Sequence, residues 1–444
     1  MDFHALESRY RERNPASETA FRRACEHVPG GVHGNITFFS PYPLTFRRGS
    51  GAWLEDVDGH RYVDYLLAFG ALALGHGHAV VRSAVNGVWD AVGTTAFGAS
   101  SVLEGELAEI VTAQYPGCES VRFTNSGLEA TLLAIRLGMA YTGRTHIATF
   151  AGHYHGSLDQ VLVSMHAPAD TLDPLPETLG LADYHLPPTI VLPFNNWEAC
   201  EKILTAHRTE VGVVMAEPME AGVLSADPSF MRRLANLTRE LGMLLVFNEV
   251  TTGFRVALGG AQEFYGVRAD LTALGKILGG GLPMGAVGGR REVMELCAPR
   301  RALEGNDVVF HSGTFNGNPV SVSAGLATLR VLRAPGVFPA LVEATGRLRR
   351  SIEERGRRAG LPLQTIGVGA LFDIVFSAEP VRDYHAYERA SMDLRRAFDF
   401  LLMERGIFSQ PLNRFSLSTV HGESERSATL AAVDDAVGAL AAMV

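Results

Sequence analysis

The chain has 444 residues, of which 47% are hydrophobic and 20% charged, and its formal net charge is −9. This length predicts two or three domains with a large buried core, and the composition is typical of a soluble globular protein. The acidic balance and the lack of a basic cluster argue against a nucleic-acid-binding surface. No apolar stretch is long enough to span a bilayer, so we expect no membrane association.

The N-terminal stretch and the cysteines indicate the compartment. Residues 1–24 are charged and amphipathic and have no apolar core, which is not the pattern of a signal peptide. The four cysteines are scattered and form no C-x-x-C pair. This spacing fits reduced thiols better than disulfides or a zinc site, so we expect a cytoplasmic protein without a bound metal.

The N-terminal third begins with expected antiparallel strands in residues 47–66, with a turn at Asp58-Gly59. Beyond residue 70, apolar strand-like runs alternate with helical patterns. Residues 121–127 have the pattern of a strand that ends in a turn. The runs 145–150, 189–194, 211–218 and 241–250 are continuously apolar, as strands covered on both faces should be.

Between the last two runs, Asp227 is a plausible helix N-cap and Pro228 the first helical residue. Strand, helix and strand in this order form a βαβ unit, so we expect a mostly parallel sheet between about 70 and 310. A long helix from residue 318 and a strand at 370–376 then suggest a smaller α+β lobe. We expect three parts: residues 1–70, which join the small domain; the large domain, 71–320; and the C-terminal small domain, 321–444.

Only two of the 39 basic residues are lysines, Lys202 and Lys276. Arginine stays protonated, so only these two can provide a nucleophilic amine. Lys202 follows Glu198 by four residues in a helical pattern, which indicates an ion pair on a solvated face. Lys276 follows an apolar strand and precedes three glycines. Burial there would lower its pKa and make it a nucleophile; the alternative is a solvated lysine at a strand end.

Three further segments carry candidate ligand contacts. Ser126 and Gly127 lie between a strand and a helix N-terminus, where free N–H groups bind phosphate, although an N-cap serine would look the same. Tyr154, in the sequence HYHG, could stack on a flat ring or simply pack at a strand end. Thr314 lies in a polar loop before a helix and could donate to a phosphate or only stabilise the turn.

Two more strands end in polar side chains. Asn248 follows the apolar run 241–247, so its side chain is expected to face the ligand crevice or to be hydrogen-bonded within it. Glu217 ends the neighbouring strand and Glu220 lies just beyond. Either carboxylate could instead be a helix-cap or sheet-end partner.

Taken together, these segments resemble the class III (ornithine/β-alanine type) aminotransferases of pyridoxal 5′-phosphate (PLP) fold type I. The resemblance is strongest to glutamate-1-semialdehyde 2,1-aminomutases and β-phenylalanine aminotransferases, and it covers almost the whole chain. It implies an α/β fold, with a large domain built on a mostly parallel seven-stranded sheet and a smaller α+β domain. The carrying segments are GAWLEDVDGHRYVDY, LGHGHAVV, FTNSGLEATLLAIRL, FAGHYHGS, AEPM, VFNEVTTGFRVA, DLTALGKILGGGLPMGAVGGR and SGTFNGNP.

The resemblance also implies roles for individual residues. Lys276 would form the Schiff base with PLP and shuttle protons. Tyr154 would stack on the pyridine ring, and Asn248 would face the pyridine nitrogen.

For the phosphate, the resemblance implies contacts from Ser126 and Gly127, and from Thr314 of the neighbouring subunit. A homodimer with shared active sites would follow.

The chain departs from the family at four places. Asn248 replaces an aspartate whose charge keeps the pyridine nitrogen protonated, so ordinary transamination should be slower by roughly 10²–10³. No arginine follows PGGV, where Asn35 lies in a stretch with His33 and Thr37, so a carboxylate clamp is missing there. Leu128 replaces a threonine. Glu220 replaces an amide or small residue, and an acid there could favour a cationic substrate or act as a base.

These features leave three functions open. We expect PLP-dependent amino-group transfer on a small amine or amino acid, as an aminotransferase or an aminomutase. The alternative is other PLP chemistry, namely racemisation, decarboxylation, elimination or cyclisation, which Asn248 motivates. A third possibility is a non-enzymatic cofactor-binding homologue. For the substrate side we expect Glu220, Asn35 and Phe69, the last within a partly aromatic pocket.

Overall fold

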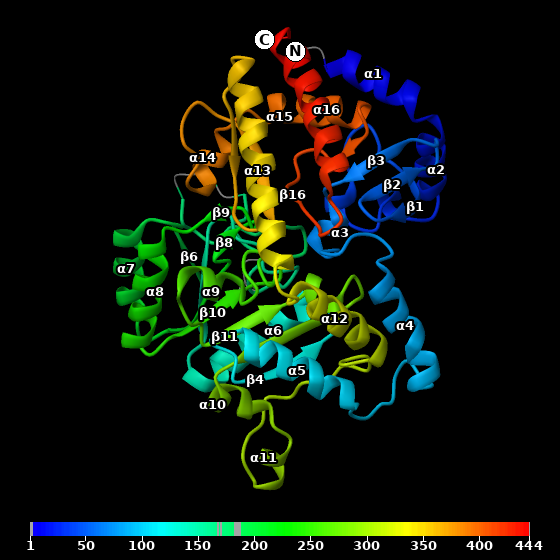
Figure 1. Ribbon diagram of the computed structural model, residues 1–444. Coiled ribbons are helices and arrows are strands. Elements are labelled where there is room, and N and C mark those ends of the chain that lie inside the picture. The colour runs from blue at the N-terminus through cyan, green and yellow to red at the C-terminus, as the bar shows by residue number, and fades with distance from the viewer. Residues whose placement is uncertain (1–2, 167, 169–170, 182–187, 444) are drawn as a thin grey trace.

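The computed structural model describes residues 3–166, 168, 171–181 and 188–443, which fold around one large sheet and two smaller ones. In Figure 1 the large sheet occupies the lower half of the molecule, and both termini lie at the top. The large sheet has seven strands, as the family resemblance implied. In spatial order they are β4 (Ser120–Thr124), β12 (Gly285–Gly289), β11 (Leu271–Leu274), β10 (Leu244–Asn248), β7 (Val211–Ala216), β5 (His146–Phe150) and β6 (Thr189–Leu192).

Six of these strands run parallel to one another, and only β12 is antiparallel to its neighbours. The mostly parallel α/β sheet predicted from the apolar runs is therefore confirmed. Strand β12 was not predicted individually, because its sequence GAVGG has three glycines, which are depleted in strands, and only one β-branched residue, Val287.

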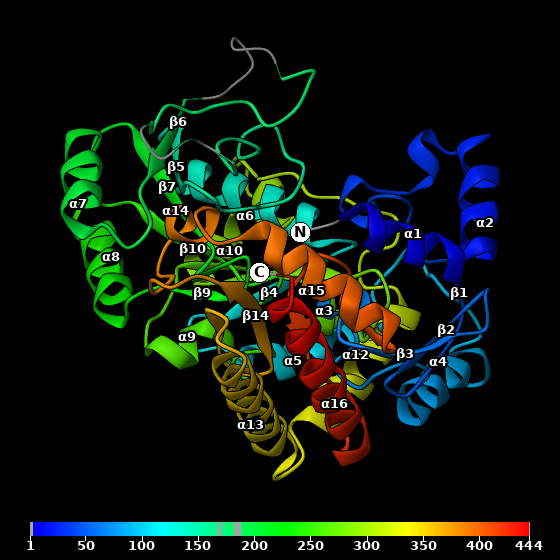
Figure 2. The ribbon, with the colours of Figure 1, turned by 90° about the horizontal axis from the view of Figure 1, so that it is seen from above.

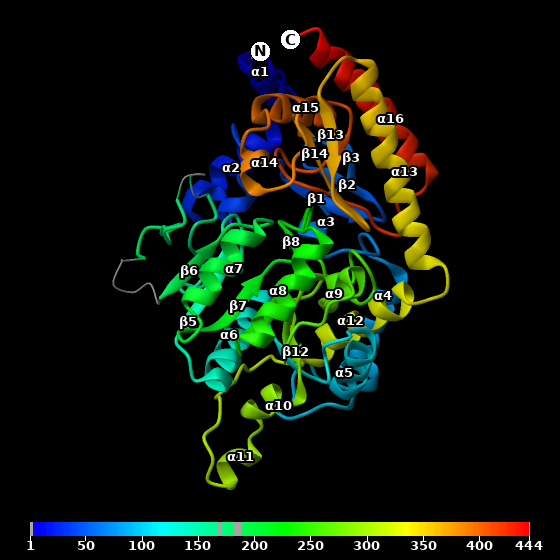
Figure 3. The ribbon, with the colours of Figure 1, turned by 90° about the vertical axis from the view of Figure 1, so that its left-hand side faces the viewer.

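Helices cover both faces of the large sheet, which is why its strands are apolar throughout. On one face, α6 (Gly127–Thr142) packs against residues of β7 and β10 such as Val213 and Val246. On the other face, α7 (Trp197–Ala206), α8 (Pro228–Glu240) and α9 (Gly260–Tyr265) form a second layer, visible in Figure 3. The Asp227 side chain caps α8 by accepting from the Ser229 N–H at 2.7 Å, as predicted.

A second set of elements packs beside the large sheet and draws on both ends of the chain (Figure 2). One small sheet has the order β1-β2-β3-β15 and the other β13-β14-β16. Because β15 pairs with β3, the first 70 residues and the C-terminal residues form one layer. The strands are β1 (Phe46–Ser50), β2 (Trp53–Asp56), β3 (Arg61–Asp64), β13 (Leu363–Ile366), β14 (Leu371–Phe376), β15 (Ile407–Phe408) and β16 (Phe415–Ser416); a separate hairpin joins β8 (Met219–Glu220) to β9 (Leu224–Ser225).

The remaining helices complete the two cores and the surface. They are α1 (Phe3–Arg13), α2 (Pro15–Cys25), α3 (Leu67–Gly70), α4 (Ala79–Ala91), α5 (Val102–Gln114), α10 (Arg291–Met294), α11 (Arg300–Leu303), α12 (Pro319–Leu332), α13 (Val337–Arg358), α14 (Tyr384–Glu388), α15 (Met392–Glu404) and α16 (Glu423–Ala441). Helices α1, α13, α15 and α16 contribute to the core of the small sheets. The segment around α11 projects from the body in Figures 1 and 3.

Buried Arg255 links these parts. Its guanidinium donates to the carbonyl of Leu417 at 2.6 Å and to the carbonyl of Gly70, so it joins the large sheet to both ends of the chain. Among the described helices, none alone is long and apolar enough to cross a membrane; the pair α12 and α13, bent by 74°, passes that test on length and composition.

Candidate active site

The carboxyl ends of four parallel strands bring the candidate residues together. Strands β11, β10, β7 and β5 are consecutive neighbours in the sheet. Lys276 lies two residues after β11, Asn248 ends β10, Glu217 follows β7, and Tyr154 follows β5. In open α/β sheets the ligand crevice lies at this edge, so these residues define one candidate site.

Lys276 is held in an unusual conformation and environment. Its backbone has φ +47°, a left-handed conformation that a side chain rarely adopts outside functional sites. Its amino group donates to the Thr251 hydroxyl at 2.9 Å. Burial lowers the lysine pKa from 10.5 to about 7, assisted by the positive charges of Arg414 and Arg255 and opposed by Glu217. A substantial fraction of Lys276 is therefore an uncharged amine at neutral pH, which is the nucleophilic form.

The peptide group of Tyr154 is held at both ends. Its N–H donates to Glu217 at 2.9 Å, and its carbonyl accepts from the Asn248 amide at 2.9 Å. The Tyr154 ring is 46% exposed, whereas Asn248 and Glu217 are buried. Burial raises the Glu217 pKa to about 7, against the opposing effect of the Tyr154 hydrogen bond and of the Arg414 and Lys276 charges. The strand ends thus fix the Tyr154 backbone while leaving the ring open to a ligand.

The N-terminus of α6 forms the candidate phosphate site. Ser126 is indeed the N-cap, and its hydroxyl oxygen accepts from the Glu129 N–H at 3.2 Å. Its O–H can still donate, so the structural role does not exclude a ligand contact. Within the described residues, no hydrogen-bond acceptor is found for the N–H groups of Gly127 and Leu128. A helix N-terminus with free N–H groups is suited to an anion.

Glycines bring the lysine, the helix N-terminus and the β10 end close together. A Cβ at Gly127 would lie 2.7 Å from the Val250 side chain, and one at Gly275 would lie 3.1 Å from it. A Cβ at Gly285 of β12 would lie 2.2 Å from the Ser126 carbonyl oxygen. This close packing, with an amine on one side and free N–H groups on the other, fits a compact ligand that carries both an aldehyde and a phosphate.

Arg414 is a further site residue that the sequence analysis missed. It lies in the loop before β16, and its Nε is buried without a hydrogen-bond partner among the described residues. Burial lowers its pKa, and Glu217 opposes that effect. The charge of Arg414 depresses the pKa values of both Lys276 and Glu217, so its guanidinium lies within electrostatic reach of both side chains. No local pattern singles it out among the 37 arginines that remain when two lysines are subtracted from 39 basic residues.

A buried charge cluster fixes the loop that carries Arg414. Arg395 of α15 pairs with Asp373 and, at 3.0 Å, with Asp399. The same arginine donates to the Asn413 carbonyl, and Asp399 accepts from the Leu412 N–H at 2.7 Å. The small domain thereby holds this loop next to the strand ends.

The other predicted residues are less clearly placed at the crevice. Glu220 is buried on β8, with Gly152 and Tyr384 as neighbours, and one of its oxygens has no partner among the described residues. Burial, with a further contribution from Glu217, raises the Glu220 pKa well above its ordinary value. Burial therefore disfavours the charged carboxylate that the expected attraction of a cation would use.

Phe69, Asn35 and Thr314 lie in three different loops. Phe69 is half-buried in the left-handed turn α3, with φ +56°. Asn35 is exposed at the start of a short 3₁₀ turn, Asn35–Thr37. Thr314 is exposed, but its loop reaches the helix N-terminus of its own chain, where Asn316 accepts from Asn125 at 2.8 Å.

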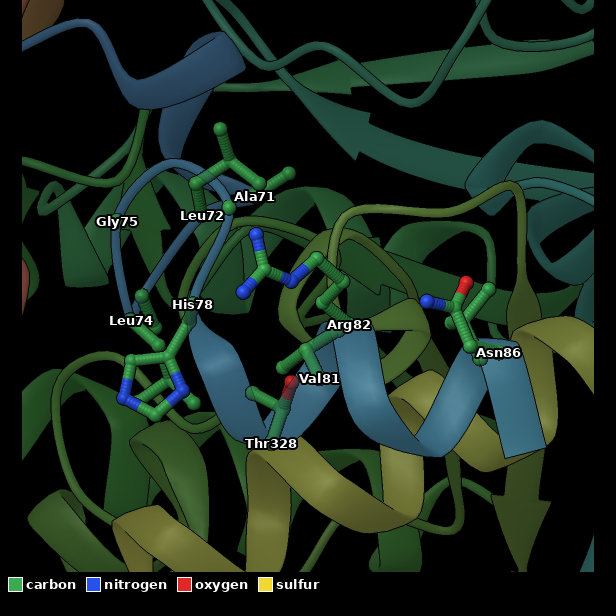
Figure 4. A pocket seen from close by; sticks show the side chains of 13 residues that line it. Ala71, Leu72, Leu74, Gly75, His78, Val81, Arg82, Asn86 and Thr328 are labelled. Atoms are coloured by element: carbon green, nitrogen blue, oxygen red, sulfur yellow. The ribbon is translucent and has the colours of Figure 1, made fainter. Parts of the chain in front are cut away.

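A cavity of about 190 Å³ lies apart from these residues, between the loop 71–78 and α4 (Figure 4). The Arg82 side chain extends across it, and Thr328 of α12 forms part of its wall. None of the candidate residues lines it, so it is not part of the site. Over the described ranges, no cluster of three or more histidine, cysteine, aspartate or glutamate side chains could hold a metal.

Comparison with known proteins gives one consistent set of relatives. The family model "Aminotransferase class-III" matches residues 39–392. A glutamate-1-semialdehyde 2,1-aminomutase from Roseiflexus castenholzii is 40% identical over 428 residues, covering 95% of this chain and 96% of that protein. The crystal structure of an omega-transaminase from Sphaerobacter thermophilus has a TM-score of 0.89 at 38% identity, covering 96% and 99% of the two chains. A β-phenylalanine aminotransferase from Variovorax paradoxus has a TM-score of 0.90 at 33% identity, covering 99% and 97%.

Proposed function

Because this chain belongs to the class III aminotransferase family and is a PLP-dependent enzyme, we propose that Lys276 is the lysine that bonds covalently to its cofactor. The chemistry is amino-group transfer, between molecules or within one. The observation that carries the assignment to Lys276 is a crowded amine with a pKa of about 7 at the carboxyl edge of the sheet. The only other lysine, Lys202, is exposed on α7.

Each of the surrounding residues is assigned to a different part of the cofactor. The free N–H groups of Gly127 and Leu128 and the hydroxyl of Ser126 would bind the phosphate, assisted by the α6 dipole. Tyr154 would cover one face of the ring, and Asn248 would hydrogen-bond to the ring nitrogen. When bound, PLP supplies an electron sink that stabilises negative charge on the substrate carbon.

Lys276 also moves the proton. With a pKa of about 7, its amine is suited to take a proton from the substrate carbon and to return it to a neighbouring atom at neutral pH. Thr251 accepts a hydrogen bond from the lysine nitrogen and so fixes its direction. Asn248 carries no charge, and we expect this to slow ordinary transamination relative to relatives with aspartate.

We assign the substrate carboxylate to Arg414. The arginine after PGGV that clamps a carboxylate in similar enzymes is absent here, and Arg414 is a buried arginine with an unpartnered nitrogen among the described residues, within electrostatic reach of Lys276. A charged hydrogen bond of this kind contributes about 1.5–3 kcal/mol, which corresponds to roughly 10–100-fold in affinity. The preferred substrate is therefore an amino acid or amino aldehyde bearing a carboxylate.

We further propose a homodimer that shares its active sites, located in the cytoplasm. Large apolar side chains are exposed in and around the projecting α11 segment: Leu303 is 90% exposed, Phe310 75% and Phe315 60%. Such a surface is typical of a subunit interface, and it is continuous in sequence with Thr314, the residue expected to reach the partner's phosphate. The four unpaired cysteines support a reducing compartment.

The cofactor assignment is tested by borohydride reduction and peptide mapping of the protein purified with PLP. We expect the label on Lys276, an absorbance change when a suitable amino acid is added, and loss of both in Lys276→Met. A label on Lys202 would refute the assignment. For Arg414→Met, KM for carboxylate-bearing substrates should rise roughly 10–100-fold, while KM for amines lacking a carboxylate should not show this rise.

Asn248 supports one second candidate, other PLP chemistry such as racemisation or elimination. Product formation without a keto-acid co-substrate, and without an intramolecular exchange of the amino group, would favour it.

A size measurement on Phe310→Asp tests the proposed dimer interface, since the dimer should dissociate or weaken.

A further inference from the structure

The side chain of Asn248 is surrounded by hydrogen-bonding groups whose identities are fixed. Its Nδ2 donates to the Tyr154 carbonyl at 2.9 Å and lies 3.0 Å from Nδ1 of His155. Its Oδ1 accepts from the Val250 N–H at 3.2 Å. On its other side, His155 Nε2 lies 2.9 Å from the Thr149 hydroxyl. Thr149, His155 and Asn248 therefore form a continuous, buried chain of hydrogen bonds from β5 to the end of β10.

The backbone partners leave only one orientation of the Asn248 amide. A carbonyl oxygen can only accept and a backbone N–H can only donate, so the nitrogen must face Tyr154 and the oxygen must face Val250. An amide nitrogen has two hydrogens, and the second points at His155 Nδ1. That nitrogen of His155 must then be the acceptor.

The state of His155 follows from this geometry. His155 is 1% exposed, and burial lowers its pKa to about 3, so the ring is neutral. With Nδ1 accepting, the proton of the ring lies on Nε2 and is donated to Thr149. Both hydrogens of the Asn248 amide are then in use. The Oδ1 atom accepts one hydrogen bond, from Val250, and its second lone pair has no donor among the described residues.

We infer that His155 and Thr149 are positioning residues that reinforce the orientation of Asn248 set by its backbone partners, with its carbonyl oxygen available to the cofactor ring. This inference rests on the proposed placement of that ring at Asn248. The ring nitrogen meets a neutral acceptor, which bonds it only when it is protonated and adds no ionic stabilisation of that proton. The site is built for an amide, because an aspartate here would place a carboxylate oxygen against the Tyr154 carbonyl. It would also require the His155 proton to move to Nδ1.

The first test uses the cofactor-free protein and ¹⁵N NMR of its histidine rings. The His155 signals are assigned by their loss in His155→Gln. We expect Nε2 protonated and Nδ1 bare in the native protein, and the proton on Nδ1 in Asn248→Asp. Thr149→Val, which keeps the shape but removes the hydroxyl, should populate the Nδ1–H form, and Thr149→Ser should restore the native pattern. The inference would be overturned if native His155 carries its proton on Nδ1. It would also be overturned if Asn248→Asp leaves the His155 signals unchanged, or if Thr149→Val does.

The second test uses PLP labelled with ¹⁵N in the ring. In the native protein the ring nitrogen should be bare at pH 7.5 and gain a proton only as the pH falls; in Asn248→Asp it should already be protonated. A ring nitrogen protonated to the same extent in both proteins would contradict the inference. Because the histidine measurement needs no cofactor, it stands even if Lys276 fails to take the label. Conversely, a labelled Lys276 with the wrong His155 tautomer overturns this inference alone.

Discussion

Replacing the buried amine with an apolar side chain of similar shape should stabilise the cofactor-free protein. The pKa of Lys276 falls from 10.5 to about 7, a difference of about 3.5. At 1.36 kcal/mol for each pKa unit, burial of this amine costs folding up to about 5 kcal/mol below pH 7. Lys276→Met removes that cost and loses one hydrogen bond to Thr251, worth about 1 kcal/mol.

The pH dependence of the free energy of unfolding shows whether the buried amine causes this stability difference. Between pH 7 and 10.5 the unfolded chain carries one proton more at Lys276 than the folded chain, so native stability rises with pH by about 1.4 kcal/mol per unit. The Lys276→Met variant lacks this slope. It should therefore be more stable than the native protein by about 3 kcal/mol at pH 7.5, and about equal to it near pH 9.5.

The measurement is the denaturant midpoint of cofactor-free protein at a fixed subunit concentration, since a dimer's stability depends on concentration. Lys202→Met is the matched control, because Lys202 is exposed, and its difference from the native protein should not vary with pH. If the Lys276→Met difference is equally independent of pH between 7.5 and 9.5, the amine is not held in its neutral form and the reasoning fails.

Two further substitutions probe how the site is built. Gly285→Ala should greatly weaken PLP binding in an equilibrium titration, because its Cβ would lie 2.2 Å from the Ser126 carbonyl oxygen. The control Gly438→Ala, in α16 with no atom within 4 Å of the added Cβ, should instead raise the free energy of unfolding by about 0.5–1 kcal/mol. Retained PLP affinity in Gly285→Ala would mean that β12 does not constrain the helix N-terminus. Arg395→Met should cost about 3–5 kcal/mol in denaturant unfolding, since it leaves two buried carboxylates without their cation, and a loss below 1 kcal/mol would exclude that role.

The large sheet could be predicted because most of its strands have a recognisable local sequence pattern. β7 and β10 are short apolar runs, as burial on both faces requires; Glu217 follows the first and Asn248 ends the second. β12 has no such signature, because contacts with Ser126, Cys118 and Asp270 require glycine at three of its five positions. The parallel pairing of β3 with β15 joins residues more than 340 positions apart, and no local pattern encodes it.

In the candidate site, too, some residues have a local sequence signal and others are placed only by long-range packing. Lys276 and Asn248 stand out in the sequence because one is among only two lysines and the other ends an apolar strand. Arg414 has no such local signal, because its loop is held in place by Arg395 and Asp399 of α15, through the Asn413 carbonyl and the Leu412 N–H. The burial of Glu220 depends likewise on α14, so its raised pKa could not be foreseen from the acid's position in sequence.

Arg414 and Glu217 act on Lys276 with opposite signs, which allows the electrostatics of the crevice to be tested by a matched pair. Arg414 lowers the lysine pKa and is the larger of the two effects, whereas Glu217 raises it. The rate at which cofactor-free protein captures PLP should follow the neutral amine, rising about tenfold per pH unit below the pKa and levelling off above it. The native midpoint is expected near pH 7.

Arg414→Met should move this midpoint to higher pH, and Glu217→Gln should move it to lower pH while keeping an oxygen for the Tyr154 N–H. A shift in the same direction for both variants would show that they act through packing rather than charge. If neither variant shifts the profile, the two side chains do not face the lysine, and the assignment of the substrate carboxylate to Arg414 falls with them.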